Sequence, residues 1–141
     1  MNHSIRQYPE KESFIKQMLI IEERIQELTD IYLSSTPYTE RKKDFFSEYI
    51  AEVERFLEDY EGGLDIPKVF IGSKVTVVYE DENEEEDFII CFPEESDPEE
   101  GCISFLSPVG RQLLLRNKGD RIALRIPAGE LKVSIQKITA Q

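Results

Sequence analysis

Two runs of apolar residues, spaced in steps of three and four, constrain this chain more than any other feature. The first comprises Phe14, Met18, Ile21, Ile25, Leu28 and Tyr32, and the second comprises Phe46, Tyr49, Val53, Phe56 and Tyr60. Such steps place apolar side chains along one seam of a helix. Neither run contains Gly or Pro. Because few residues separate the two predicted helices, the chain must reverse, and the seams are predicted to meet as an antiparallel coiled-coil hairpin.

The segment between the runs, "LSSTPYTE" (33 to 40), carries five hydroxyl side chains and a proline. Thr36 or Ser35 is predicted to cap the second helix, with Pro37 in its first turn and Glu40 close to capping-box spacing. Each arm of about 19 residues would span roughly 29 Å at 1.5 Å per residue. The pattern therefore indicates a narrow stalk with a polar tip.

Glycines and a proline mark the end of the hairpin at "YEGGLDIPKVF". Gly62 and Gly63 stop the helix and Pro67 prevents its resumption, so residues 1–64 and 65–141 are predicted to form separate domains. Beyond this boundary β-branched and aromatic residues predict five short strands at 73–80, 87–92, 101–106, 120–126 and 130–138. "PAG" (127 to 129) is a predicted hairpin turn between the last two.

One short helix is predicted between the third and fourth strands. Ser107 is a suitable N-cap and Pro108 a suitable first helical residue, with Leu113, Leu114 and Leu115 as the apolar face and Gly119 as the terminator. The predicted fold class is therefore α+β, a helical hairpin followed by a sheet packed on one helix.

The net charge of −12 is concentrated in one segment. Twelve acids and no Lys or Arg lie between Glu80 and Glu100, and the rest of the chain carries 29 − 12 = 17 acids against 17 bases. Such a segment repels nucleic acid phosphate and suits a basic protein surface. A solvated hairpin turn explains it equally simply.

The sequence predicts neither a metal site nor a cofactor. Cys91 and Cys102 are expected to be reduced and packed, because two cysteines are too few for a disulfide scaffold, and the single His3 leaves no zinc ligand set. No apolar run approaches a membrane span, and "MNHSIRQYPE" lacks the features of a signal peptide. A cytoplasmic location is expected.

Four motifs in the second half occur in the order found in one family. They are Gly72, Ser73 and Val75 at a strand start, the acidic loop "PEESDPEEGCIS", "SPVG" opening a helix, and "KGD" before the fourth strand. Over about 70 residues this half resembles the C-terminal domain of the GreA and GreB transcript-cleavage factors and of the related nucleoside diphosphate kinase regulator. The resemblance implies an FKBP-like antiparallel sheet on one helix and an N-terminal coiled-coil hairpin.

The resemblance also implies a partner, RNA polymerase, and a role in regulating transcription elongation. In that family the globular domain grips the polymerase at its secondary channel and the coiled coil enters the channel. If the polymerase-binding surface of the family is carried over to this sequence, it comprises Glu95, Asp97, Pro98, Ser104, Ser107 and Pro108. No direct sequence-specific contact with nucleic acid is expected, and a monomer is expected because a hairpin satisfies its own seam.

The tip departs from the family pattern. Cleavage factors present carboxylates near a "GDL.EN.EY" motif, which help the polymerase to hold Mg²⁺. Aligning Tyr38 with the tyrosine of that motif leaves Ser34, Ser35, Thr36 and Pro37 in place of the acids and the asparagine. The sequence therefore predicts a non-catalytic factor.

Three alternatives stay open. Asp30 is predicted about one turn below the tip on the first helix, and Glu40 and Asp44 on one face of the second at i, i+4 spacing. These three acids would form an improvised metal-holding cluster that supports cleavage, although Arg41, Lys42 and Lys43 would oppose it. A prolyl isomerase or chaperone role is weakened because Phe88, Phe92 and Phe105 lie in strand patterns typical of a core. Regulation of nucleoside diphosphate kinase or another non-polymerase enzyme rests on resemblance alone.

Overall fold

The structure, a computed structural model, describes residues 9–141, so the prediction about His3 and the opening segment lies outside the described residues. The chain forms two compact units, one ending at Gly63 and one running from Leu64 to Gln141. Among the described residues no helix is both long and apolar enough to cross a membrane.

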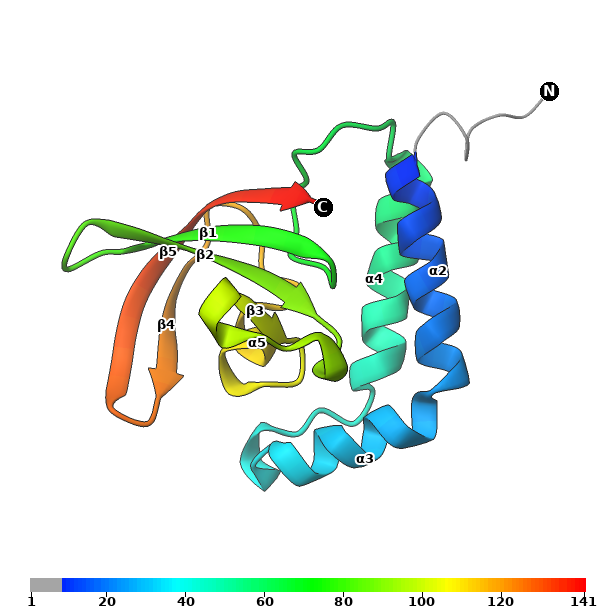
Figure 1. Cartoon of the computed structure of the whole chain (residues 1–141), viewed down its shortest axis with the longest axis horizontal. Coiled ribbons are helices and arrows are strands. Elements are labelled where there is room, and N and C mark those ends of the chain that lie inside the picture. Colours follow the sequence, from blue (N-terminus) through cyan, green and yellow to red (C-terminus); the bar gives the residue numbers. More distant parts are fainter. Residues whose placement is uncertain (1–8) are drawn as a thin grey trace. The chain divides into compact units, whose positions relative to one another are not determined.

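Within residues 9–63, the described part of the first unit, there are three α-helices: α2 (Pro9–Glu23), α3 (Ile25–Ser35) and α4 (Phe45–Asp59) (Figure 1). The prediction of one straight first arm is wrong, because the helix breaks at Arg24 and α3 turns away from the axis of α2. The Arg24 backbone has φ −109° and ψ 19°, yet helical hydrogen bonds continue on both sides, from Arg24 N to Ile20 O and from Leu28 N to Arg24 O. The break is therefore confined to one residue.

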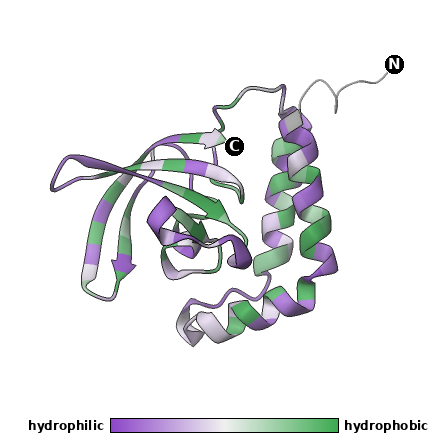
Figure 2. Ribbon diagram, in the orientation of Figure 1, coloured by the Kyte–Doolittle hydropathy of each residue, from purple (hydrophilic) through white to green (hydrophobic). Residues whose placement is uncertain are grey.

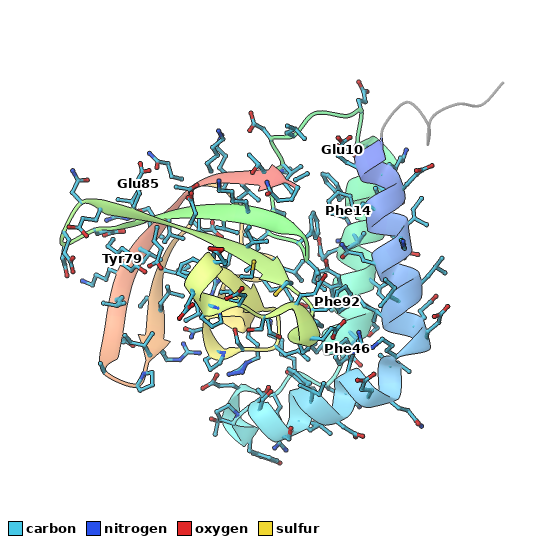
Figure 3. All side chains as sticks on the ribbon, viewed as in Figure 1. Glu10, Phe14, Phe46, Tyr79, Glu85 and Phe92 are labelled. Atoms are coloured by element: carbon cyan, nitrogen blue, oxygen red, sulfur yellow. The ribbon has the colours of Figure 1, made fainter. Side chains whose placement is uncertain are left out.

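The antiparallel pairing is formed by α2 and α4 alone. Phe14 packs edge-on against Phe56 at 5.3 Å between ring centroids, while Ile21 and Val53 are fully buried. Phe46 lies at the start of α4 and Phe14 nearer the other end of the pair (Figure 3). Most seam positions are buried as predicted, but Ile25, directly after the break, is 39% exposed.

The apolar face of α3 packs on the start of α4. Leu28 and Tyr32 are buried, and the Tyr32 ring stacks on Phe45 at 4.3 Å and meets Phe46 edge-on at 5.9 Å. Burial of these large side chains outweighs the small cost of interrupting one helical residue. This packing accounts for the bend without any Gly or Pro.

The second unit is a five-stranded sheet with the order β3-β2-β1-β5-β4. Its strands are β1 (Ser73–Tyr79), β2 (Glu84–Cys91), β3 (Cys102–Ser104), β4 (Arg121–Ile126) and β5 (Gly129–Ala140). The final pair is antiparallel as predicted, with Ile126 opposite Gly129 across the turn. Figure 2 shows the hydrophilic β1–β2 turn projecting from the sheet.

The sheet is mixed, which corrects the prediction of an all-antiparallel one. β3 pairs with β2 in parallel, with Ile90 opposite Ile103. Two short 3₁₀ turns, η2 (Pro93–Glu95) and η3 (Pro98–Glu100), lie between the strands and return the chain so that β3 runs in the direction of β2.

The helix α5 (Pro108–Leu113) packs beside β3, and the curved sheet surrounds it (Figure 1). As predicted, Ser107 is its N-cap, and the Ser107 hydroxyl accepts a hydrogen bond from Gly110 N at 3.2 Å. The helix ends at Leu113 rather than near Gly119, because Leu115 adopts a left-handed φ of 66°. A Cβ on Gly110 would lie 2.0 Å from the Ser104 carbonyl oxygen, so glycine permits this close packing.

Candidate functional site

The predicted surface around residues 95–108 is formed by an ordered loop. Asp97 N–H donates to Cys102 O at 2.8 Å, and Cys102 N–H donates to Asp97 O at 3.0 Å. The Glu95 carboxylate accepts a hydrogen bond from Phe92 N at 3.2 Å. Residues 94–100 are nevertheless exposed, so the loop presents its carboxylates to solvent from a fixed backbone.

The two serines of the predicted surface hold the loop to α5. Ser104 is buried, and its hydroxyl accepts from Leu106 N at 3.0 Å. The Ser107 hydroxyl donates to Ser104 O at 2.7 Å. Pro108 is exposed beside them. The structure thus brings the six predicted residues into one segment, in which Ser104 supports the surface from within.

The acidic run also extends into the sheet. Glu84, Glu85 and Glu86 lie within β2, although the sequence placed them in the turn. Glu80 forms a bidentate ion pair with Arg121, with oxygen–nitrogen distances of 2.8 and 2.9 Å, and accepts from the Ser134 hydroxyl at 3.0 Å. The hydrogen bonds from Arg121 are the main reason that the pKa of Glu80 falls from 4.5 to about 2. This end of the run is therefore part of the sheet structure.

Tyr79 on β1 and Glu86 on β2 are diagonal neighbours, because the register places Glu84 opposite Tyr79 and Val77 opposite Glu86. Figure 3 labels Tyr79 on this pair of strands. The Tyr79 hydroxyl donates a hydrogen bond to the Glu86 carboxylate. Burial first, and then this hydrogen bond, raise the pKa of Tyr79 well above its usual value. Tyr79 accordingly remains a neutral donor at physiological pH.

The cysteines and the predicted core phenylalanines have packing roles. Cys91 and Cys102 are unbridged, and burial raises the pKa of the buried Cys91 thiol to about 11, which makes the thiolate scarce. Phe92 and Phe105 are buried and meet edge-on at 5.7 Å. Phe88 is half-buried.

The polar tip is built differently from the prediction. The hydroxyls of Ser34 and Ser35 donate back to Ile31 O within α3, at 3.1 and 2.7 Å. Thr36 is the C-cap of α3 and is buried, so neither Thr36 nor Ser35 caps the next helix. Pro37 precedes a 3₁₀ turn, η1 (Tyr38–Glu40), and Tyr38 is 83% exposed. The second helix begins only at Phe45, after Asp44.

Arg41 explains this arrangement. Its Nη2 donates to Leu33 O at 2.8 Å and its Nε donates to Thr36 O at 3.0 Å. The Leu33 carbonyl belongs to the last turn of α3 and Thr36 is the C-cap, so neither carbonyl has a partner within the helix. Lys42 N–H donates to the Tyr32 hydroxyl at 2.7 Å. The arginine therefore caps the C-terminal end of α3 and the tyrosine holds the connection to α4, whose N-cap is Asp44 without a side-chain cap hydrogen bond.

The three candidate acids are exposed and lie on three different elements. Asp30 lies on α3, Glu40 in η1, and Asp44 at the N-cap of α4, so Glu40 and Asp44 do not share a face of the second helix as predicted. Across residues 9–141, no group of three or more His, Cys, Asp and Glu side chains is placed to hold a metal ion. The improvised metal-holding cluster does not form in this structure.

The fold and motifs define a class of protein, the bacterial transcription elongation factors. The family described as "Transcription elongation factor, GreA/GreB, C-term" matches residues 65–140, which is more than half of the chain. A structure titled "Prokaryotic transcription elongation factor GreA/GreB from Nitrosomonas europaea" shares the fold, with a TM-score of 0.55 and 24% identity over 89% of this chain and 93% of that one.

Relatives extend the match beyond the sheet unit. Transcription elongation factor GreA of Magnetococcus marinus is 32% identical over 115 residues, covering 78% of this chain and 73% of the relative. GreA of Desulfovibrio desulfuricans is 43% identical over 68 residues, covering 48% of this chain. The chain belongs to the GreA/GreB family of transcription elongation factors. It matches less than half the length of several relatives, 42% in the Desulfovibrio protein and 45% in that of Listeria welshimeri.

Proposed function

We propose that this chain binds RNA polymerase at the secondary channel and modulates transcription elongation without stimulating RNA cleavage. The observation that carries the proposal is the match of residues 65–140 to the family's C-terminal domain, combined with a tip that lacks the family's carboxylates. A cytoplasmic, monomeric factor fits this role.

The polymerase-binding surface proposed here is the exposed loop with Glu95, Asp97 and Pro98, together with Pro108 at the start of α5. Its backbone is held by the Asp97–Cys102 pair of hydrogen bonds and by Ser107, so little ordering is required on binding. Exposed carboxylates suit a basic partner surface, where they set orientation and association rate more than affinity.

The proposed absence of cleavage stimulation rests on the chemistry of the tip. Mg²⁺ requires oxygen ligands, and a second ion needs carboxylate charge. Here the hydroxyls of Ser34 and Ser35 are used within α3, and Arg41, Lys42 and Lys43 lie beside the tip. Three cations disfavour a further dication by direct repulsion.

The bend at Arg24 supports the same conclusion. The straight part of the first arm is limited to the 15 residues of α2, about 23 Å at 1.5 Å per residue. A tip carried on α3 does not extend along the axis of the α2–α4 pair (Figure 1).

Two assays, performed one after the other, test the proposal. Retention by immobilised core RNA polymerase is expected, and its absence would favour a non-polymerase partner such as nucleoside diphosphate kinase. On backtracked elongation complexes, no increase in RNA cleavage is expected. Stimulated cleavage that disappears in Glu40→Ala or Asp44→Ala would instead establish the alternative of an active cleavage factor.

A further inference from the structure

A pocket of about 460 Å³ lies between the end of α3 and the start of α4. Its lining includes Tyr32, Tyr38, Arg41, Lys42, Lys43 and Phe45. The volume is within the range of small-molecule sites, and the mixture of aromatic walls with a few charged groups is typical of them. The function proposed above uses the cations of this lining only as a barrier to a metal ion and assigns the pocket no ligand.

The charge of the pocket is opposite to that of the chain. Arg41, Lys42 and Lys43 form the only run of adjacent bases in a sequence with a net charge of −12. The lining contains one acid, Asp44, so its formal charge is 3 − 1 = +2. The first turn of the 15-residue α4 also lines the pocket and adds its positive end. This combination selects an anion and rejects a metal cation.

Arg41 is positioned before any ligand arrives. Two of its five N–H donors are used on Leu33 O and Thr36 O, which leaves three for a ligand. Lys42 is held through its backbone N–H on the Tyr32 hydroxyl, so its side chain is free to extend. The Lys42 ammonium lies 4.0 Å from Glu48, a weak exposed pair that a phosphate would outcompete. The backbone is therefore ordered while the cationic groups remain available.

Aromatic rings supply the other half of the site. Tyr38 is 83% exposed, and the Arg41 guanidinium carbon lies 5.7 Å from its ring centroid. Tyr32 and Phe45 stack at 4.3 Å and form a wall of the pocket. An exposed ring beside cations is suited to a ligand that combines a flat base with phosphate, since a base can stack on an aromatic side chain.

We propose that this pocket binds a free nucleoside polyphosphate, with its phosphates on Arg41, Lys42 and Lys43 and its base on Tyr38. The proposal does not depend on polymerase binding, because every group it uses lies between residues 29 and 47 of this chain. A nucleotide bound here would lie against the connection between α3 and α4.

Titration of the full chain with ATP, without polymerase, tests the proposal. Tyrosine fluorescence is a direct reporter because the chain has no Trp. Saturable binding is expected, weakened about tenfold in the double variant Lys42→Gln/Lys43→Gln, which loses two exposed phosphate contacts. The matched control is Lys16→Gln/Lys137→Gln, which removes the same charge from exposed positions outside the pocket and should bind ATP like the parent chain.

Further probes distinguish the contribution of the phosphates to binding from that of the base. Tyr38→Ala should weaken ATP binding but leave the weaker binding of inorganic triphosphate unchanged, measured by calorimetry. Equal affinity for ATP and triphosphate, or unchanged ATP binding in Lys42→Gln/Lys43→Gln, would overturn the proposal. Binding of a single-stranded oligoribonucleotide with no saturable binding of ATP would overturn it as well.

Discussion

The Tyr49 hydroxyl donates a hydrogen bond to Gln17 Oε1 across the α2–α4 pair, where both side chains are buried. Around it the two helices pack through fully apolar side chains such as Ile21 and Val53. A buried polar pair of this kind is satisfied in only one register of the two helices. The pair therefore fixes the alignment of α2 on α4.

Tyr49→Phe is expected to lower the free energy of unfolding by about 1–3 kcal/mol, because it leaves the Gln17 carbonyl oxygen buried without this donor. Urea denaturation followed by circular dichroism measures the change. The double variant Gln17→Met/Tyr49→Phe should recover most of the loss, since neither side chain then carries an unsatisfied polar group. Tyr38→Phe, at an exposed position, is the control and should change stability by less than about 0.5 kcal/mol. Equal stability of Tyr49→Phe and the parent chain would show that the hydrogen bond does not contribute.

Gly110→Ala is expected to destabilise the sheet unit strongly, by about 3 kcal/mol or more, because the new Cβ would meet the Ser104 carbonyl at 2.0 Å. Gly119→Ala is the matched control: its φ is +94° but nothing lies within 4 Å, so only backbone strain of roughly 1 kcal/mol is expected. Thermal unfolding of the two variants compares the costs. A smaller effect at Gly110 than at Gly119 would contradict the close packing of α5 on β3.

The Glu80–Arg121 pair predicts a specific dependence on pH. A pKa that folding lowers from 4.5 to about 2 contributes stability above the unfolded value and loses it as the pH falls toward 2. Parent chain and Arg121→Gln should therefore differ in stability at pH 7 and converge near pH 2. Carbon-detected NMR titration of the Glu80 carboxyl should show its pKa return toward 4.5 in the variant. If the Glu80 carboxyl of the parent chain instead had a pKa near 4.5, the Glu80–Arg121 pair could not be the cause of a stability difference that depends on pH.

The heptad pattern predicted most of the buried helix positions but not the bend. Arg24 is a good helix former and neither Gly nor Pro is near it, so nothing local marks the break. The cause is distant in sequence, namely the packing of Tyr32 on Phe45 and Phe46. The spacing of apolar residues specifies which face of a helix is buried. It does not specify whether the helix axis stays straight or bends to reach the element on which that face packs.

In the sheet and the candidate sites as well, features set by neighbouring residues could be predicted, whereas features set by residues distant in sequence could not. Ser107 and Pro108 predicted the start of α5, because capping is a local property. The parallel pairing of β3 could not be predicted, since it depends on the path of two 3₁₀ turns. At the tip, Ser35 and Thr36 suggested an N-cap for the second helix, but α4 begins after Asp44, and Arg41 instead binds carbonyls at the C-terminal end of α3. The run of Arg41, Lys42 and Lys43 was the one visible signal of the pocket.

The most direct test of the central claim is the affinity of this chain for core RNA polymerase, compared with that of Asp97→Lys. Reversal of one exposed charge on the loop is expected to weaken binding at least about tenfold and to slow association, most clearly at low salt. Glu130→Lys, an exposed reversal at the β4–β5 turn, is the control for net charge. Unfolding midpoints should match in all three proteins. Loss of affinity in Asp97→Lys alone is the predicted result, whereas undetectable binding of the parent chain, or equal binding by all three, would contradict the account.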